Sequence, residues 1–290
     1  MSEGAARIRL ERRAAQAAAR LPDLLAAASH AAEVVTAGRH PRRKAGRSET
    51  FWQFRDYHPG DPVSAIDWRQ SARLERRLLV RQHEWEQPQT LLLWCGGSED
   101  FDFGGEGREP KRFRGQVIAL ALGILALRAG ERVGLWASPE TPRAGVHAVH
   151  GLAEAMLHAE PELGSGVPVA GATVVLVSDF HAPPEELALA FAKVRDARGH
   201  AIAVVVEDPD EESFPFEGST RFEGARGRAR RFFGEAGAIR SSYLDARSAH
   251  HDALLDIARG ADEAVVFHRT DGPLTPLLLS LAQRIGGGLL

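Results

Sequence analysis

The residues best suited to chemistry come after two apolar runs, at the points where predicted strands end. Cys95, Ser98, Glu99, Asp100 and Asp102 follow the run TLLLW, and Ser178, Asp179 and His181 follow ATVVLV. In an open α/β sheet such strand ends lie at one edge, where ligands bind. Carboxylate and hydroxyl oxygens suit Mg²⁺ or Mn²⁺. A structural reading is also open, in which Asp179 caps the helix beginning near Pro183 and Asp100 and Asp102 face solvent.

Other kinds of chemistry receive less support from the residues. A nucleophilic Cys95 would need a nearby base and an oxyanion hole, and no partner stands out in the sequence. The 12 histidines form no HExxH pair, and neither a P-loop nor a GxGxxG fingerprint is present. The segment Arg39–Arg55 mixes arginines with aromatic residues, which leaves nucleic-acid binding as a hypothesis.

The candidate residues at the strand ends are positioned by a predicted alternation of apolar strands with helices. Strands are predicted at TLLLWCG, ERVGLWA, ATVVLVSDF, HAIAVVVED and EAVVFH, and helices at RGQVIALALGILALRAG, GLAEAMLHAE, PPEELALAFAKVRDARG, 240–259 and 274–285. Strands made almost wholly of Val, Leu and Ile require cover on both faces, which is typical of a parallel sheet. We therefore predict a doubly wound, Rossmann-like α/β domain over residues 89–290. The segment 213–235 predicts a hairpin at the edge of this sheet.

Two further segments precede that domain. Residues 1–38 predict an N-terminal helical segment, broken near Leu21–Pro22. Residues 39–88 predict a small β-rich module, in which FWQFRDY and RRLLVRQHEW form strands around a turn at residues 58–61.

Composition restricts the function class. The chain has 36 Lys/Arg against 39 Asp/Glu, and residues 1–90 hold 16 of these cations but only 11 of the carboxylates. The single cysteine excludes an internal disulfide framework and fits a reducing compartment. The longest nearly apolar run, Val117–Leu127, is shorter than the roughly 20 residues that span a membrane. With no signal-peptide pattern at the start, we expect a cytoplasmic protein.

The stretch from Phe54 to Glu86 carries the most specific pattern. It contains R-x-Y-x-P-G-D, then I-D-W, then S-A-R, at Arg55, Tyr57, Pro59, Gly60, Asp61, Ile66, Asp67, Trp68, Ser71, Ala72 and Arg73. This combination resembles the signature of a bacterial domain-of-unknown-function family, number fifty-eight. VVLVSDF, FPFEG and HRTDGPL are similar to the same family, so the resemblance extends from about Arg43 through most of the chain.

The resemblance implies a von Willebrand factor A-like α/β domain and a MoxR-type AAA+ ATPase as partner. Domains of that type often bind a divalent cation through D-x-S-x-S after the first strand and an Asp after a later strand. Here Cys95, Gly97 and Glu99 replace the ligands of the first motif, whereas Asp179 matches the later Asp. We therefore expect a degenerate metal site and no bound cofactor.

The signature also has a physical interpretation. Asp61 can accept hydrogen bonds from turn amides, and Arg55, Asp67 and Arg73 can form a charged network around Trp68. Such a network would either fix the β-rich module onto the α/β domain or form a partner-binding surface.

The leading hypothesis is a non-enzymatic, cytoplasmic protein-interaction module that works with the ATPase in protein assembly or maturation. Its expected interaction residues are Arg55, Tyr57, Gly60, Asp61, Asp67, Trp68, Arg73, Ser98 and Asp100. A divalent-metal-dependent binding domain, a hydrolase using Asp179, Asp100 or Cys95, and a nucleic-acid-binding protein stay open as alternatives.

Overall fold

The computed structural model describes residues 3–37, 50–58, 61, 63–73, 77–84, 88–96, 99–158, 162–223, 230–261 and 263–286. The chain divides into an α/β unit, made of Met1–Gly38 and Gln89–Leu290, and a small unit, Arg39–Pro88. The division expected from the sequence has the same two borders, but residues 1–38 are not a separate segment. They belong to the α/β unit.

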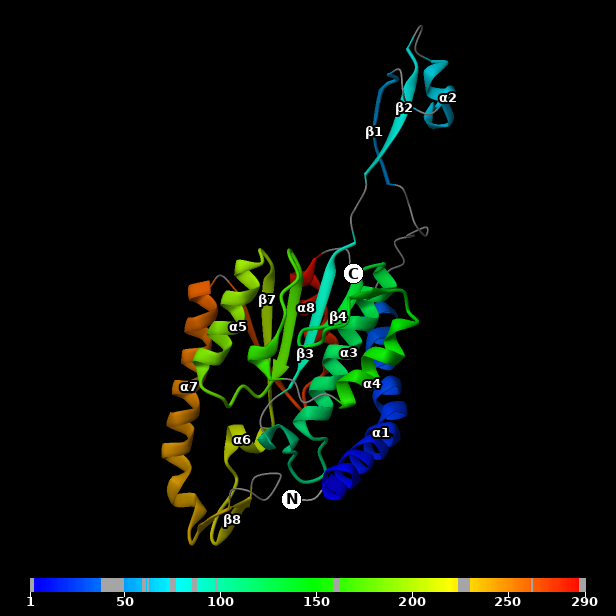
Figure 1. The fold of residues 1–290 in the computed structure, drawn as a ribbon. Helices are drawn as coiled ribbons and strands as arrows, with labels where there is room; N and C mark the ends of the chain where they lie inside the picture. Colours follow the sequence, from blue (N-terminus) through cyan, green and yellow to red (C-terminus); the bar gives the residue numbers. More distant parts are fainter. Residues whose placement is uncertain are drawn as a thin grey trace. The chain divides into compact units, whose positions relative to one another are not determined.

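A six-stranded sheet forms the centre of the α/β unit (Figure 1). Its strands are β3 (Thr90–Cys95), β4 (Arg132–Leu135), β5 (Arg143–Ala144), β6 (Thr173–Ser178), β7 (His200–Glu207) and β10 (Ala264–Arg269). The strand order is β10-β7-β6-β3-β4-β5, and every pair is parallel except β4 with β5. The structure thus confirms the mostly parallel α/β sheet predicted from the sequence.

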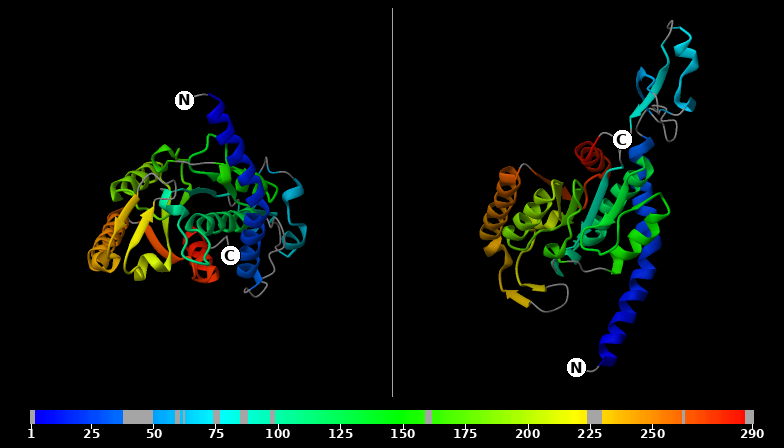
Figure 2. Two further views of the ribbon diagram at one scale, coloured as in Figure 1. Left: turned by 90° about the horizontal axis from the view of Figure 1, so that it is seen from below. Right: turned by 45° about the horizontal axis from the view of Figure 1, so that its top comes forward.

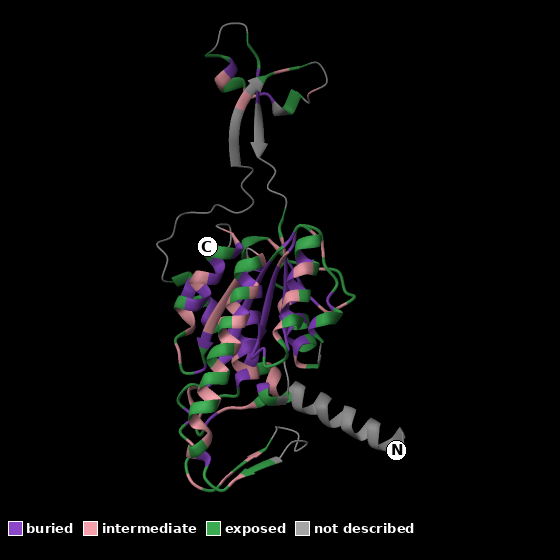
Figure 3. Ribbon diagram, turned by 90° about the vertical axis from the view of Figure 1, so that its left-hand side faces the viewer, coloured by how far each residue is buried: buried purple, intermediate pink, exposed green. Residues whose placement is uncertain are grey.

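Helices cover both faces of the sheet (Figure 2). One face packs against α3 (Lys111–Ala129), α4 (Ala148–His158) and α8 (Leu274–Ile285), and the other against α5 (Pro184–Asp196) and α7 (Arg240–Ala261). Helix α1 (Glu3–Ala37) packs on α3, α4 and α8. Successive strand residues point to opposite faces, so Leu91 and Leu93 join the first core and Leu92 and Trp94 the second. Figure 3 shows the resulting buried sheet between partly exposed helices.

Helix α1 runs through Pro22, so the break expected at Leu21–Pro22 is wrong. A proline inside a helix removes one backbone hydrogen bond. Beyond it, Leu24, Ala28 and Ala32 are fully buried, and α1 packs against α3 and α4. This packing holds the helix together despite the proline, because tertiary burial supplies most helical stability in proteins.

Helix α3 is buried along most of its length. The run Val117–Leu127, which lies within a predicted helix, is buried throughout. A Cβ at Gly115 would lie 2.8 Å from Phe101 Cζ and 3.2 Å from Cys95 Sγ, so glycine lets the start of α3 approach the end of β3 closely. Among the described residues no helix is both long and apolar enough to cross a membrane.

The predicted hairpin is present, but it does not join the main sheet. Strands β8 (Thr220–Glu223) and β9 (Arg230–Phe233) form a sheet of their own. Aromatic rings anchor its base, because Phe222 packs on both Phe214 and Phe233, and Phe214 also contacts Tyr243 of α7. Side-chain packing, rather than pairing with an edge strand, therefore holds the hairpin.

Short helical elements complete the α/β unit. They are η2 (Glu99–Asp102), η3 (Leu163–Ser165), α6 (Pro209–Ser213) and η4 (Ala236–Ile239).

In the small unit, β1 (Thr50–Asp56) pairs antiparallel with β2 (Leu79–Glu84), as predicted. The connection between them is longer than a turn and contains η1 (Val63–Ala65) and α2 (Trp68–Ser71). Asp61 accepts a hydrogen bond from the His58 amide at 2.9 Å, which confirms its expected role at the turn. Pro59 and Gly60 lie outside the described residues.

Candidate functional site

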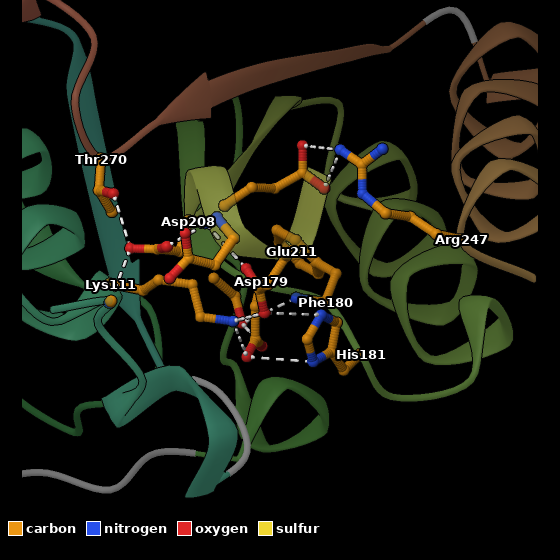
Figure 4. Close-up of polar contacts among 12 residues, drawn as sticks. Lys111, Asp179, Phe180, His181, Asp208, Glu211, Arg247 and Thr270 are labelled. Atoms are coloured by element: carbon orange, nitrogen blue, oxygen red, sulfur yellow. Dashed lines mark hydrogen bonds and ion pairs between the residues drawn. The ribbon is translucent and has the colours of Figure 1, made fainter. Parts of the chain in front are cut away.

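The carboxyl edge of the parallel strands gathers the polar residues of the α/β unit (Figure 4). Strand β3 pairs with β4 on one side and β6 on the other, so the strand order reverses there. In open α/β sheets a ligand site is expected at this reversal. Asp179 follows β6, Asp208 follows β7 and Thr270 follows β10. Three buried polar clusters result.

Lys111 is the centre of the first cluster. Its side chain is completely buried, and its Nζ lies 2.6 Å from Glu211 Oε1 and 3.3 Å from Asp179 Oδ2. Its backbone N–H donates to the carbonyl of Phe103 at 2.8 Å, which fixes the start of α3. A cation at a helix N-terminus is unfavourable toward the helix dipole. The two carboxylates offset this cost, as well as that of removing the ammonium from water.

His181 lies on the solvent side of this ion pair. Its Nδ1 is 3.5 Å from Asp179 Oδ2 and its Nε2 is 3.8 Å from Glu211 Oε1, while its side chain is 41% exposed. Phe180, between Asp179 and His181, has φ of 49°, in the left-handed region. This unusual backbone is held on both sides, since the Phe180 amide donates to Ser178 Oγ and its carbonyl lies 2.8 Å from His250 Nε2.

Asp208 is the centre of the second cluster and is fully buried. Its carboxylate accepts hydrogen bonds from Arg108, the Thr270 hydroxyl and the amides of Gly105 and Asp210. Burial alone would raise the pKa of Asp208. The hydrogen bonds from Arg108 and from the two amides lower this pKa by more, so that it lies below the usual value. Asp208 also caps α6 in a capping box with Glu211, which links the second cluster to the first.

Glu207 is the centre of the third cluster. Arg247 Nη2 lies 2.9 Å from both of its oxygens, and His251 Nε2 lies 2.7 Å from Oε1. Burial raises the pKa of Glu207, yet the contacts with His251 and Arg247 lower it overall. Glu207, Arg247 and His251 line two adjoining pockets of about 610 and 230 Å³. The smaller one also contains Asp179 and His181 and so connects the first and third clusters.

The cluster around Lys111 does not fit the degenerate metal site in which Asp179 was the expected remaining ligand. Both carboxylates at this point contact the Lys111 ammonium, and Asp179 Oδ1 accepts a hydrogen bond from Ser178. In the described part of the chain no group of three or more His, Cys, Asp or Glu residues is arranged to hold a metal ion. Asp179 does not cap α5 either, because the N-cap residue of that helix is Pro183 and no side-chain hydrogen bond caps it.

Asp100 and Asp102, two described carboxylates of the loop after β3, do not join this cluster. Asp100 is exposed in η2, and Asp102 Oδ1 lies 2.6 Å from Arg112 Nε. Ser98 lies outside the described residues. Burial raises the pKa of Cys95 to about 12, so the thiol is protonated at neutral pH and lacks the thiolate that nucleophilic attack requires.

The expected network around Trp68 is not formed between Asp67 and Arg73. Asp67 instead caps α2 by accepting hydrogen bonds from the amides of Arg69 and Gln70, and the side chain of Arg73 is exposed. Trp68 is 59% exposed. Tyr57 is half-buried, and its amide donates to the Leu78 carbonyl. The side chain of Arg55 is not among those that the structure describes.

Sequence reasoning missed Lys111, Arg108, Asp208 and Glu211. The pattern Asp208-Pro209-x-Glu211 is a helix-start signature, and it could have located α6 and its two carboxylates. For Lys111 the only signal is rarity, since the chain has just three lysines, Lys44, Lys111 and Lys193.

These features define an α/β protein with an open, mostly parallel sheet whose strand ends carry buried ion pairs. The family model described as "Protein of unknown function DUF58" matches residues 53–253, so the chain belongs to the DUF58 family. Searches of curated proteins and of solved structures found no match.

Proposed function

We propose that this DUF58 protein is a non-enzymatic protein-binding module that works without a bound metal ion, with a MoxR-type AAA+ ATPase as its partner in protein assembly or maturation. The partner follows from the family resemblance in the signature. We also assign the α/β unit to the von Willebrand factor A-like folds. The position of β3 between β4 and β6, with one short antiparallel strand at the edge, supports this assignment.

The observation that carries the proposal is the Lys111 ammonium. In von Willebrand A-like domains the Asp after the later strand contacts a divalent cation, and the Asp at that position here, Asp179, contacts Lys111 Nζ instead. The ammonium is a compact point charge with three donors, so it can neutralise Asp179 and Glu211 together. Because this cation is part of the chain, binding at the strand ends needs no metal.

The same edge of the sheet offers an acidic outer surface. Exposed carboxylates in the loops at this edge include Asp100, Glu106 and Glu109, and two more, Glu212 and Asp271, bind Arg269. Such groups attract Lys and Arg side chains of a partner and speed association, with an effect that salt screens. We therefore expect a basic complementary surface on the ATPase.

A binding titration with the MoxR-type ATPase encoded nearest to this gene tests the proposal. We expect Asp100→Lys to weaken binding by about tenfold or more, since it places a like charge against the partner. Glu154→Lys is the matched control, because Glu154 is exposed on α4, away from the strand ends, and it should bind like the wild type.

Two conditions make the test decisive. With nucleotide-free ATPase, the dissociation constant should be the same in Mg²⁺ and in a chelator, and it should rise as salt is added. Absence of binding in every nucleotide state would refute the partnership. Loss of binding in the chelator, restored by Mg²⁺, would instead support a metal-dependent module.

A further inference from the structure

The small unit exposes apolar side chains that a folded chain usually buries. Val63 is 61% exposed, Trp68 59% and Leu78 41%. Eight large hydrophobic residues are exposed in the described part of the chain, and these three all come from the small unit. Single exposed apolar residues are ordinary, but a group of them around a tryptophan is typical of a binding surface. We call Val63, Trp68 and Leu78 the Trp68 surface.

Hydrogen bonds connect the segments that carry these side chains. The Asp67 amide, next to Trp68, donates to the carbonyl of Leu79, next to Leu78, at 2.9 Å. The Ile66 amide donates to the Val63 carbonyl at 3.3 Å, and Ile66 forms a bridge with Val80. The three exposed residues therefore lie in segments whose backbones are joined by hydrogen bonds.

Helix α2 holds Trp68 in a fixed position. Asp67 Oδ1 accepts the amides of Arg69 and Gln70 at 3.1 and 3.0 Å. Ser71 Oγ donates to the Asp67 carbonyl at 2.8 Å and accepts from the Leu79 amide at 2.8 Å. An aromatic side chain on a fixed backbone loses little entropy on binding, which suits it to be an energetic anchor of an interface.

The charges beside the Trp68 surface indicate the kind of partner. Arg69 and Arg73 are exposed, and no carboxylate of a described residue forms an ion pair with either. Arg77 differs, because its guanidinium binds Asp56. Two arginines available beside an apolar surface are complementary to an apolar pocket bordered by Asp or Glu.

A nucleic acid fits this surface less well than a protein does. Val63 and Leu78 have no ring on which a base could stack. The carboxylates of Asp61 and Asp67 lie in the same connection between β1 and β2 and would repel phosphates.

We propose that the Trp68 surface docks into an apolar, acid-bordered pocket of a partner protein. The Trp68 surface belongs to the small unit and the strand-end face to the α/β unit, and the proposal does not require the partner to be the AAA+ ATPase.

Photo-crosslinking in the cells that produce the protein tests this docking. A benzophenone amino acid replaces Trp68 in one full-length variant and Val146 in the control variant. Val146 is 52% exposed and belongs to the α/β unit. We expect an adduct with another protein at position 68 that position 146 does not give, and mass spectrometry then identifies that protein for purification.

The purified partner then decides the outcome. Binding should weaken by about tenfold or more in Trp68→Ala and in Arg73→Glu, and it should be unchanged in Val146→Ala. Because all three residues are exposed, the variants should melt like the wild type, which is checked first. Four results would overturn the proposal: no adduct above the control, an adduct within the same chain, an adduct with nucleic acid, or partner binding that is unchanged in Trp68→Ala. Failure of the ATPase titration alone would refute the function proposed above and not this docking.

Discussion

At the scale of single residues, the buried Lys111 ion pair is the feature with the largest energetic consequences. Moving an ammonium and a carboxylate out of water costs several kcal/mol each, and their mutual attraction offsets this cost only with good geometry. Lys111 meets two carboxylates, and a serine hydroxyl also binds one of them. Removal of the cation therefore leaves Asp179 buried without its compensating charge.

Lys111→Met should reduce the free energy of unfolding by about 3 to 5 kcal/mol, because it keeps the length of the side chain and deletes its charge. Urea unfolding of the full chain measures the loss. Lys193→Met is the matched control, since Lys193 is exposed and donates to the Gly164 carbonyl, and it should cost less than about 1 kcal/mol. Equal stability of the two variants would show that the Lys111 pair contributes nothing.

Excess Mg²⁺ should leave the melting temperature of the wild type unchanged. A ligand that binds only the folded state raises stability by mass action. Here the Lys111 ammonium already contacts the carboxylates that a cation would use. Differential scanning fluorimetry with and without Mg²⁺ checks this expectation. A rise of several degrees that Asp179→Ala abolishes would establish a metal site.

His268 should make the protein less stable in mild acid. Burial, together with the charge of Arg114, lowers the pKa of His268 from 6.5 to about 4. Between these two pH values the unfolded chain binds a proton that the folded chain does not. Stability should therefore decrease as pH falls through this range, by up to about 1.4 kcal/mol per pH unit.

Urea unfolding from pH 7 to pH 4 measures this dependence. His268→Gln should give a flatter profile, because the variant has no group at that position to titrate. His200→Gln should follow the wild type, since His200 is exposed at the start of β7. A wild-type slope in His268→Gln would assign the pH dependence to other groups.

At the scale of elements, the pattern of apolar residues predicted the strands of the sheet and the long helices. A sheet that is buried on both faces needs strands made almost wholly of apolar residues, and such runs are easy to recognise in a sequence. The long-range contacts left no comparable pattern. Lys111 reads as one more polar residue at a helix start, and its burial depends on Glu211, which lies 100 residues away. The role of Asp67 as a helix cap was equally hidden, since α2 is only four residues long.

Asp67→Ala should destabilise the small unit by about 1 to 2 kcal/mol, the usual cost of losing a helix N-cap. Arg73→Ala should change stability by less than about 0.5 kcal/mol, because its side chain is exposed. Hydrogen exchange of the amides in residues 77–84 measures both effects on β2. Equal loss of protection in the two variants would mean that the two residues act as one network, as first expected from the sequence.

At the scale of the whole molecule, the chain leaves the α/β unit after α1, forms the small unit, and returns at Gln89 to build the sheet. Helix α1 and the helices that it packs against, α3, α4 and α8, are thus separated by the small unit, residues 39–88. The sequence did not predict that the N-terminal helix belongs to the α/β unit, because the composition of an Ala-rich helix does not indicate which part of the chain it contacts. The buried side chains of α1 show that it completes the core of the α/β unit.

Leu24→Ala should therefore destabilise the α/β unit, although Leu24 precedes the small unit in sequence. Leu24 is fully buried in the core that α1 shares with α3, and removal of such a side chain costs about 2 to 5 kcal/mol. Val34→Ala, on the same helix but 39% exposed, should cost less than about 1 kcal/mol. Hydrogen exchange should show α3 losing protection in Leu24→Ala while β1 and β2 keep theirs. Unchanged protection of α3 would mean that the N-terminal helix is an independent segment, because a helix that shares a cooperative core cannot lose a buried leucine without loosening its neighbours.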